Sequence, residues 1–197
     1  MKKLTVGFFV LMITLVIAGC ATTPKVPPVN TFFEQGDDGW VHYFTNDRAR
    51  YGFQQRKTFD NPNSDPNVYE VDVKKISGFE NMGFGLLFGA KDDNNFYVVN
   101  VYVKGIYGVR KSVGGTITNL TGSDSPLINQ GFDVVNSIKV VKGGAGYDIY
   151  LNGNSTPVYT VTDTSVTGNK IGYYVLIGAS GYENFPDNPV DVRFKIK

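Results

Sequence analysis

Two carboxylates on one predicted strand come nearest, of all the residues in this sequence, to a catalytic pair. Glu70 and Asp72 alternate with valines, so both acids would lie on the same face of a β-strand. Glycoside hydrolysis needs two carboxyl groups across the scissile bond, about 5–5.5 Å apart in enzymes that retain configuration. Alternating acids are also the ordinary polar face of a strand, and we favour that interpretation over catalysis.

Other catalytic chemistry finds little support in the residue types present. His42 is the only histidine and Cys20 is the only cysteine. A Ser-His-Asp triad would need His42, and no nucleophile elbow accompanies it. The sequence has no Cys/His cluster with metal-ligand spacing. We therefore predict no catalytic residues and no cofactor.

One run of oxygen-bearing side chains is a candidate for a metal site. Asp92, Asp93, Asn94 and Asn95 carry the hard oxygen ligands that calcium prefers. The same residue types favour a tight turn between strands, and their spacing does not match an EF-hand loop. We favour an ordinary turn, with a structural calcium near Asp92 and Asp93 as the alternative.

A sheet face rich in aromatic and polar residues offers a third kind of chemistry. Aromatic residues make up 14% of the chain, and tyrosine can stack on a sugar ring while its hydroxyl forms a hydrogen bond. The alternation assigns to the core Tyr69, Val71, Val73, Tyr97, Val99 and Val101. The opposite face then carries the candidate ligand-binding residues Glu70, Asp72, Asn100, Tyr102 and Arg110. Gly85 and Gly89 would leave room above this face for a shallow groove, although a merely solvated face is the commoner arrangement.

A long connection before the last predicted strand, over 178–189, is a second candidate surface. Long loops in compact domains are often functional. Tyr182 and Phe185 lie in this loop and would suit a contact with a protein or a glycan.

The first twenty residues have the layout of a secretory signal. Lys2 and Lys3 precede an apolar run over 4–17, which is shorter than the roughly 20 residues that a membrane span needs. Residues 16–20 read Val-Ile-Ala-Gly-Cys and resemble the lipobox of bacterial lipoproteins. In that family a diacylglycerol is attached to the cysteine thiol and a peptidase cuts just before the cysteine. The resemblance implies a signal peptide over 1–19 and a lipid anchor on Cys20.

This organisation predicts an envelope protein. Residues 20–29 hold the lipidated cysteine and three prolines, which favour an extended spacer, and the folded domain is expected over 30–197. Ala21 follows Cys20, so by resemblance to lipoproteins of bacteria with two membranes we expect the outer membrane or cell surface rather than the inner membrane. Removal of Lys2 and Lys3 changes the net charge from +1 to −1, which argues against a nucleic-acid partner. The expected partners are membrane lipid through Cys20 and a glycan or surface protein.

The remainder of the chain is predicted to be all β. Apolar and polar residues alternate, or apolar runs of strand length recur, at 69–73, 84–88, 97–103, 107–113, 135–141, 147–151, 158–161, 171–177 and 190–196. Turn signals stand between them at Gly114-Gly115, Gly143-Gly144 and Asn152-Gly153. A single cysteine cannot form an internal disulfide, so burial must stabilise the domain. These signals predict a two-sheet antiparallel β-sandwich or jelly roll.

Several short motifs follow one another in a fixed order: Asp37–Trp40, Phe84–Phe88, Lys91–Tyr97, Tyr107–Lys111, Asn152-Gly153 and Gly168–Gly172. Together they resemble the concanavalin A-like lectin/glucanase superfamily, in its bacterial laminin G-like branch. The resemblance implies two sheets with Greek-key connections and a concave face on which lectins and glucanases bind sugars. Laminarinase-type glucanases of the superfamily carry E-x-D-x-x-E, and this chain has Lys75 at the third position.

We therefore expect a non-catalytic, envelope-anchored β-sandwich that binds a glycan or another surface partner. A divergent glycoside hydrolase and a purely structural envelope protein are the alternatives. Because this fold hosts enzymes, lectins and adhesion modules alike, the function has to be argued from the site.

Overall fold

The computed structural model describes residues 30–47, 50, 53–177 and 189–197 of the chain. These residues form thirteen strands and no α-helix. The strands are β1 (Thr31–Gln35), β2 (Val41–Thr45), β3 (Gln54–Asp60), β4 (Val68–Ser77), β5 (Gly83–Asp92), β6 (Asn95–Val101), β7 (Ile106–Val113), β8 (Thr116–Asp124), β9 (Asn136–Gly143), β10 (Gly146–Leu151), β11 (Tyr159–Val161), β12 (Lys170–Leu176) and β13 (Val190–Ile196).

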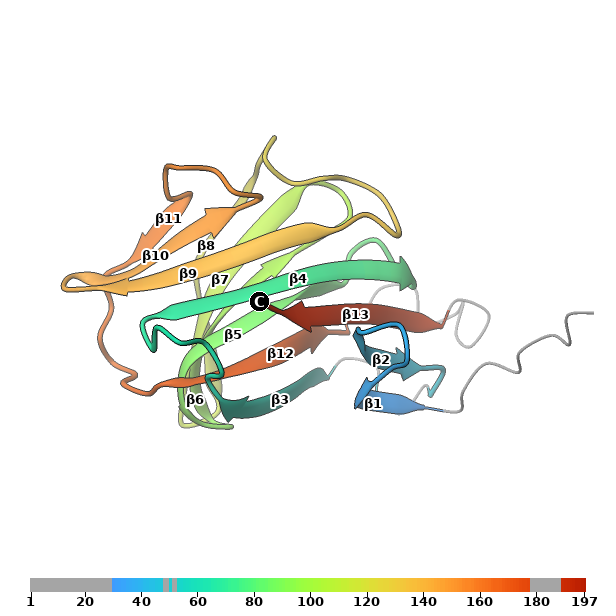
Figure 1. Cartoon of the computed structure of the whole chain (residues 1–197), viewed down its shortest axis with the longest axis horizontal. Helices are drawn as coiled ribbons and strands as arrows, with labels where there is room; N and C mark the ends of the chain where they lie inside the picture. Colours follow the sequence, from blue (N-terminus) through green and yellow to red (C-terminus); the bar gives the residue numbers. More distant parts are fainter. Residues whose placement is uncertain (1–29, 48–49, 51–52, 178–188) are drawn as a thin grey trace, which may run out of the picture.

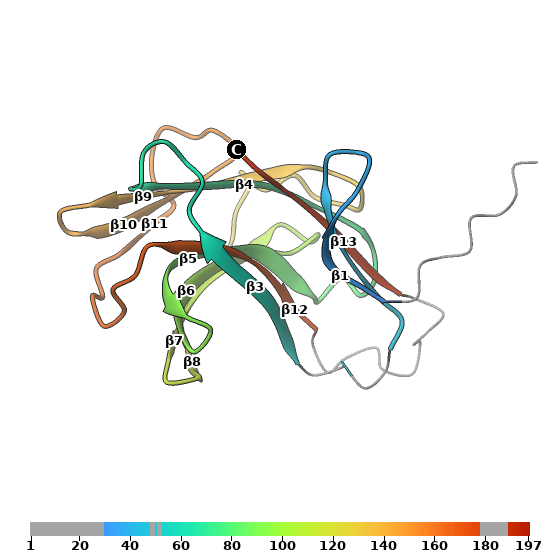
Figure 2. The ribbon, with the colours of Figure 1, turned by 60° about the horizontal axis from the view of Figure 1, so that its bottom comes forward.

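The strands pair into two sheets that lie one above the other (Figures 1 and 2). Sheet A has seven strands in the order β1-β2-β13-β4-β9-β10-β11, and sheet B has six in the order β3-β12-β5-β6-β7-β8. Strands far apart in sequence are neighbours, since β13 pairs with β2 and β4, and β12 pairs with β3 and β5, all antiparallel. The structure confirms the predicted all-β, two-sheet sandwich.

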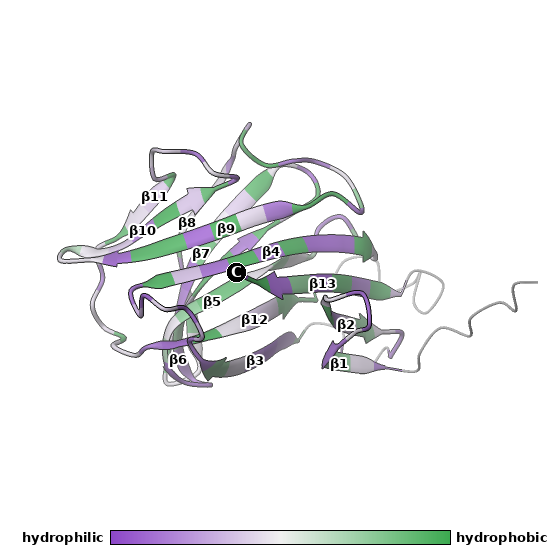
Figure 3. Cartoon of the chain, viewed as in Figure 1, coloured by the Kyte–Doolittle hydropathy of each residue, from purple (hydrophilic) through white to green (hydrophobic). Residues whose placement is uncertain are grey.

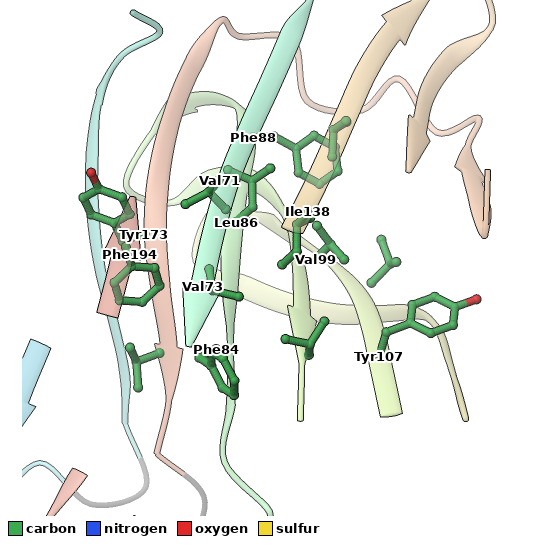
Figure 4. Packing of buried hydrophobic residues seen from close by; sticks show 14 of the residues in the cluster. Val71, Val73, Phe84, Leu86, Phe88, Val99, Tyr107, Ile138, Tyr173 and Phe194 are labelled. Atoms are coloured by element: carbon green, nitrogen blue, oxygen red, sulfur yellow. The ribbon is translucent and has the colours of Figure 1, made fainter. Parts of the chain in front are cut away.

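The inward faces of both sheets form one hydrophobic core (Figure 4). Val71 and Val73 of sheet A lie across from Leu86 and Val99 of sheet B, and all four side chains are fully buried. Every residue that the alternation assigned to the core belongs to this cluster. Burial of one such side chain stabilises by about 1.5–3 kcal/mol, and a slip of one residue would move a whole strand's apolar set to the other face. The alternation of apolar and polar residues along β4 and β9, visible in Figure 3, therefore fixes their register.

The sequence pattern missed four strands: β1, β2, β3 and β8. Three of them, β1, β3 and β8, are sheet edges with one partner strand each. No residue of β8 is buried, so its sequence shows no apolar face. Edge strands need less burial than central ones, and their residues carry a weaker signal.

The predicted glycine-containing turns differ in how they connect the strands. Gly114 and Gly115 both have positive φ, 58° and 85°, and join β7 to β8 by the two-residue hairpin that the sequence predicts. Asn152 and Gly153 also have positive φ, but they begin a longer loop, because β10 pairs with β11 only from Ile149, opposite Tyr159. The predicted turn at Asn152-Gly153 is therefore present, with the Asn154 N–H donating to the Leu151 carbonyl at 3.1 Å, but it does not join β10 and β11 as a two-residue hairpin.

Several predictions concern residues outside the described part of the chain. They are the signal peptide over 1–19, the linker over 20–29 with Cys20, and the loop residues Tyr182 and Phe185. These stay predictions. Within the described ranges, the structure contains no helix with the length and apolar character of a membrane span.

Candidate functional site

The five candidate ligand-binding residues lie on two different sheets. Glu70 and Asp72 are on β4 of sheet A, whereas Asn100 and Arg110 are on β6 and β7 of sheet B and Tyr102 directly follows β6. Hydrophobic neighbours of each of these residues along the strands, such as Val71, Val99 and Val109, belong to the shared core. We call the side of each sheet that points away from this core its outer face. The two groups are therefore on opposite sides of the molecule, and the single groove expected from the sequence is wrong.

The outer face of sheet A carries charges that neutralise one another. Lys197 Nζ lies 3.5 Å from a Glu70 carboxylate oxygen and 3.1 Å from an Asp72 oxygen. Lys139 stands opposite Glu70 in the strand pairing. A hollow of about 740 Å³ opens here, with Tyr150 and Ser137 also in its lining. The two acids thus share one lysine, which is the arrangement of a solvated polar face.

Lys75 does not extend this carboxylate pair, because its side chain points the opposite way. It is fully buried, and its Nζ donates to the carbonyl oxygens of Phe79 and Met82. Burial lowers the pKa of Lys75 from 10.5 to about 7. The third position of the glucanase motif is therefore part of the interior of this domain.

The outer face of sheet B is built on a second, smaller apolar cluster. Its buried members are Leu87, Ala90, Phe96, Val98 and Tyr174, against which Ile117 and Leu176 pack. Outer faces of antiparallel sheets are usually polar when water covers them. The buried apolar cluster makes this face different from the outer face of sheet A.

One row of paired residues, which includes Tyr174 of this cluster, crosses all six strands of sheet B. In strand order the row reads Arg56, Tyr174, Gly85, Asn100, Gly108 and Gly122. Gly85 is required here, since a Cβ would lie 2.1 Å from the Val99 carbonyl oxygen. At Gly108 a Cβ would find its nearest neighbours at 3.5 Å and 3.6 Å, both in the Asn100 side chain. The glycines on either side of Asn100 place no side chain of their own beside it.

Gly89 does not contribute to this open surface. A Cβ there would meet the Tyr147 hydroxyl oxygen at 2.7 Å, and Tyr147 belongs to the core between the sheets. The backbone at Gly89 has a φ of 57° and lies where the β5–β6 register shifts. The expectation that Gly89 leaves room above the outer face was therefore wrong.

Asn100 is the most unusual residue of this row. Its side chain is fully buried, and neither its Nδ2 nor its Oδ1 has a hydrogen-bond partner among the described residues. The Arg56 Nε is buried and unpartnered in the same row. An unpaired buried donor or acceptor costs about 1–3 kcal/mol, so such groups need an explanation such as bound water or a ligand.

Tyr102 and Arg110 lie beside Asn100 and contact each other. An Arg110 Nη2 donates to the Tyr102 hydroxyl at 3.1 Å, while both side chains stay partly exposed. They line a hollow of about 270 Å³ together with Gly108, Asn119 and Glu80 among others. We call Arg56, Asn100, Tyr102, Arg110 and Tyr174 the Asn100 site.

The remaining candidates of the sequence are tied into local structure. Asp92 accepts hydrogen bonds from the Asn94 backbone and the Asn95 side chain, which lower its pKa, and Asp93 accepts one from Thr58. Within the described ranges no three His, Cys, Asp or Glu residues gather as metal ligands would. These contacts are those of a turn; calcium at Asp92 and Asp93 stays a prediction.

His42 lies on the outer face of sheet A. Its Nε2 is 2.7 Å from an Asp38 oxygen and 2.6 Å from an Arg193 guanidinium nitrogen. Arg193 also binds Asp191, and Asp191 raises the pKa of Arg193. His42 is therefore one member of a local network of charged side chains at the β2–β13 pair.

Sequence reasoning missed Arg56 and Tyr174. Arg56 lies on β3, an edge strand that the pattern did not predict. Tyr174 alternates with the core residues Tyr173 and Val175, so period-two alternation within the predicted strand 171–177 could have placed it on the outer face.

No protein-family model matches this chain, and no curated protein matches it either. Among solved structures, the carbohydrate-binding module CBM66 from Bacillus subtilis is similar, with a TM-score of 0.55 and 17% identity over 80% of this chain and 93% of the module. The β-glucanase of Bacillus licheniformis has a TM-score of 0.49 and 13% identity, over 82% of this chain and 78% of the enzyme. At such identities the similarity shows the fold alone. It confirms the concanavalin A-like jelly-roll architecture that the motifs implied.

Proposed function

We propose that this domain binds a glycan on the outer face of sheet B and does not cleave it. The observation that carries the proposal is the buried, unpaired carboxamide of Asn100, which Gly85 and Gly108 flank and which a sugar would reach by displacing the side chains that now cover it. A carboxamide offers both donors and an acceptor, which suits a sugar hydroxyl that both donates and accepts. The Tyr102 ring stands beside it and supplies a surface on which a sugar ring can stack.

The charges near this site support binding without hydrolysis. Glu80 is the one carboxylate that lines the hollow beside Tyr102 within the described ranges, and Lys104 neutralises it at 3.0 Å. A glycosidase needs a second carboxyl group for its acid and base or nucleophile. The acidic pair Glu70 and Asp72 lies on the opposite side of the sandwich and shares Lys197. That the similar CBM66 structure is described as a carbohydrate-binding module agrees with this proposal.

The proposed site lies on a domain that we infer to be anchored in the cell envelope through lipid on Cys20. The support is the lipobox-like sequence over 16–20 and the proline-rich spacer over 20–29. One acyl chain binds a membrane only marginally, so stable anchoring needs two or more hydrophobic signals. Attachment to the outer membrane or cell surface would present the glycan-binding face to an extracellular or envelope polysaccharide.

Substitution of the cysteine tests the anchor. Cys20→Ser removes the thiol, so the precursor should stay uncleaved and should incorporate no palmitate analogue. Metabolic labelling followed by gel mobility measures both. A Cys20→Ser protein that is still labelled, or still cut at the same bond, would overturn the lipid anchor.

Glycan binding is tested with the full chain extracted in detergent, on a glycan array and in a reducing-sugar assay. We expect binding without turnover, and a loss of about tenfold in affinity for Tyr102→Ala. Tyr150→Ala, in the hollow of sheet A, is the matched control and should bind as the unmodified chain does. Turnover that disappears in Glu70→Gln would establish the hydrolase alternative, and an array without any binding would leave the purely structural alternative.

A further inference from the structure

The outer face of sheet B has two arginines that form no ion pair with any acid among the described residues. Within the described ranges, the ion pairs of arginine involve Arg50 and Arg193 only. Arg110 has the Tyr102 hydroxyl as its hydrogen-bond partner, and Arg56 packs over the Phe96 ring at 5.4 Å. Both guanidinium groups thus lie on this face without a carboxylate within ion-pair distance.

Three of the acids around the same sheet are each paired with a lysine. Asp60 at the end of β3 lies 2.9 Å from the Lys170 ammonium, and Glu80 lies 3.0 Å from that of Lys104. Asp163 binds Lys111. These pairs neutralise three acids of the rim, and neither Arg56 nor Arg110 takes part in them.

Both arginines lie close enough to Tyr174 to influence the pKa of its phenol. Burial raises the pKa of its phenol, and the positive charges of Arg110 and Arg56 both oppose that rise. Tyr174 stands between Arg56 and Gly85 in the row that contains Asn100. A ligand anion above this row would therefore be attracted by both arginines, beside the unpaired carboxamide.

We propose that the glycan bound at the Asn100 site is acidic, and that Arg110 receives the carboxylate of a hexuronate residue. This inference rests on the proposed glycan-binding function. The Arg110 guanidinium gives one N–H to Tyr102 and keeps others for a carboxylate, whose two oxygens match its fork. Asn100 then binds a hydroxyl of the same or the adjacent sugar.

The same arrangement disfavours a neutral glycan. A neutral chain that covered this face would remove water from two guanidinium groups without supplying a counter-charge. Sites whose polar groups are left unpaired by the wrong ligand reject that ligand strongly. The two unpaired arginines therefore act as a selectivity device as well as a source of affinity.

Two polymers that differ in the carboxyl group alone test the inference: polygalacturonate and its fully methyl-esterified form. The full chain in detergent should bind polygalacturonate about tenfold more tightly, and added salt should weaken that binding more than binding to the ester. Arg110→Gln should abolish the preference but leave binding to the ester within about twofold. Arg110→Lys keeps the charge and loses the fork, so it should recover only part of the preference.

Lys139→Gln provides the matched control, because it removes one positive charge from the hollow of sheet A. It should leave the preference unchanged. Equal binding of the two polymers, or equal losses for Arg110→Gln and Lys139→Gln, would overturn the acidic-glycan inference while glycan binding itself stands. Dextran sulfate that competes as well as polygalacturonate would show attraction of any polyanion and would also overturn the carboxylate assignment. Failure of every glycan to bind would instead reject the proposed function.

Discussion

The two outer faces of this sandwich are made of similar residue types but differ in how those residues are satisfied. On sheet A, Glu70 and Asp72 share Lys197, and His42 and Arg193 share Asp38, so charges meet partners on their own surface. On sheet B an apolar cluster is buried in the outer face, and among the described residues Arg56 and Arg110 have no acidic partner and the buried Asn100 carboxamide has no hydrogen-bond partner.

The difference indicates which face is completed by a ligand. A face whose polar groups bind one another gains little from a further molecule, because those bonds would have to be exchanged. A face with unpaired groups gains each bond that a ligand supplies. The larger of the two hollows is on sheet A, at about 740 Å³ against about 270 Å³ beside Tyr102. The volume of the hollow therefore favours sheet A as the ligand site, whereas the unpaired polar groups favour sheet B. We give more weight to chemistry, since both acids in the hollow of sheet A already have Lys197 as a shared counter-charge.

The largest expected effect on stability comes from a charge placed at an inward position of β6, compared with a truncation at the outward position that follows it. Val101→Asp places an unpaired charge in the core and should destabilise by about 4 kcal/mol or more, which unfolds most domains. Tyr102→Ala removes a partly exposed ring and should change stability by about 1 kcal/mol or less. Thermal melting of both variants decides the register. A greater loss for Tyr102→Ala would remove the distinction between core and outer face on which the site depends.

A second large effect is the pH dependence of stability caused by Lys75, which is buried in the core, unlike the charged side chains on the outer face of sheet A. The unfolded chain keeps the Lys75 proton up to pH 10.5, but the native protein keeps it only up to about pH 7. The native state is therefore penalised fully below pH 7, and stability rises between these two values by an amount on the order of 5 kcal/mol. Denaturant unfolding of the unmodified chain should show this rise relative to Lys75→Met, which has no titrating group there. A constant difference between the two proteins across that range would mean that Lys75 is solvated.

A smaller effect than those at Val101 and Lys75 is an expected stabilisation at Asn100. Asn100→Leu replaces an unpaired carboxamide by an apolar side chain of similar size, so the free energy of unfolding should increase by about 1–3 kcal/mol. Glycan binding should be lost in the same variant. Asn136→Leu is the control, because the Asn136 side chain binds Asn129 and Asn152, and its loss should destabilise. A destabilised Asn100→Leu would show that the amide is already satisfied in the free protein.

Much of the fold could be predicted, because period-two alternation follows directly from burial between two sheets. Central strands such as β4 and β6 have one face in the core, so their sequences alternate clearly between apolar and polar residues. The edge strands β3 and β8 lack this alternation and were not predicted as strands. The predicted strand over 97–103 ends at Val101, because the chain turns there and the Gly105 N–H donates to the Tyr102 carbonyl. That turn places Tyr102 next to Arg110.

The site was harder to predict, because alternation tells which residues share a face of one strand but not which sheet that strand joins. Glu70 and Asn100 therefore looked equivalent in the sequence, although β4 pairs with β13 and β9 while β6 pairs with β5 and β7. Arg56 reaches the site through β12, more than a hundred residues later in the chain than β3. Contacts of this range are set by topology, which no local pattern contains.

The most direct test of the central claim is a steric block on each outer face. Gly108→Val adds a side chain above Asn100 without a backbone clash, and Ser137→Val adds a similar volume in the hollow of sheet A. Both are strand positions where valine is favoured, so both proteins should fold. Titration with the best glycan from the array should show a loss of at least about tenfold for Gly108→Val and a change within about twofold for Ser137→Val. Loss of binding in Ser137→Val with normal binding in Gly108→Val would place the ligand on sheet A and contradict this account.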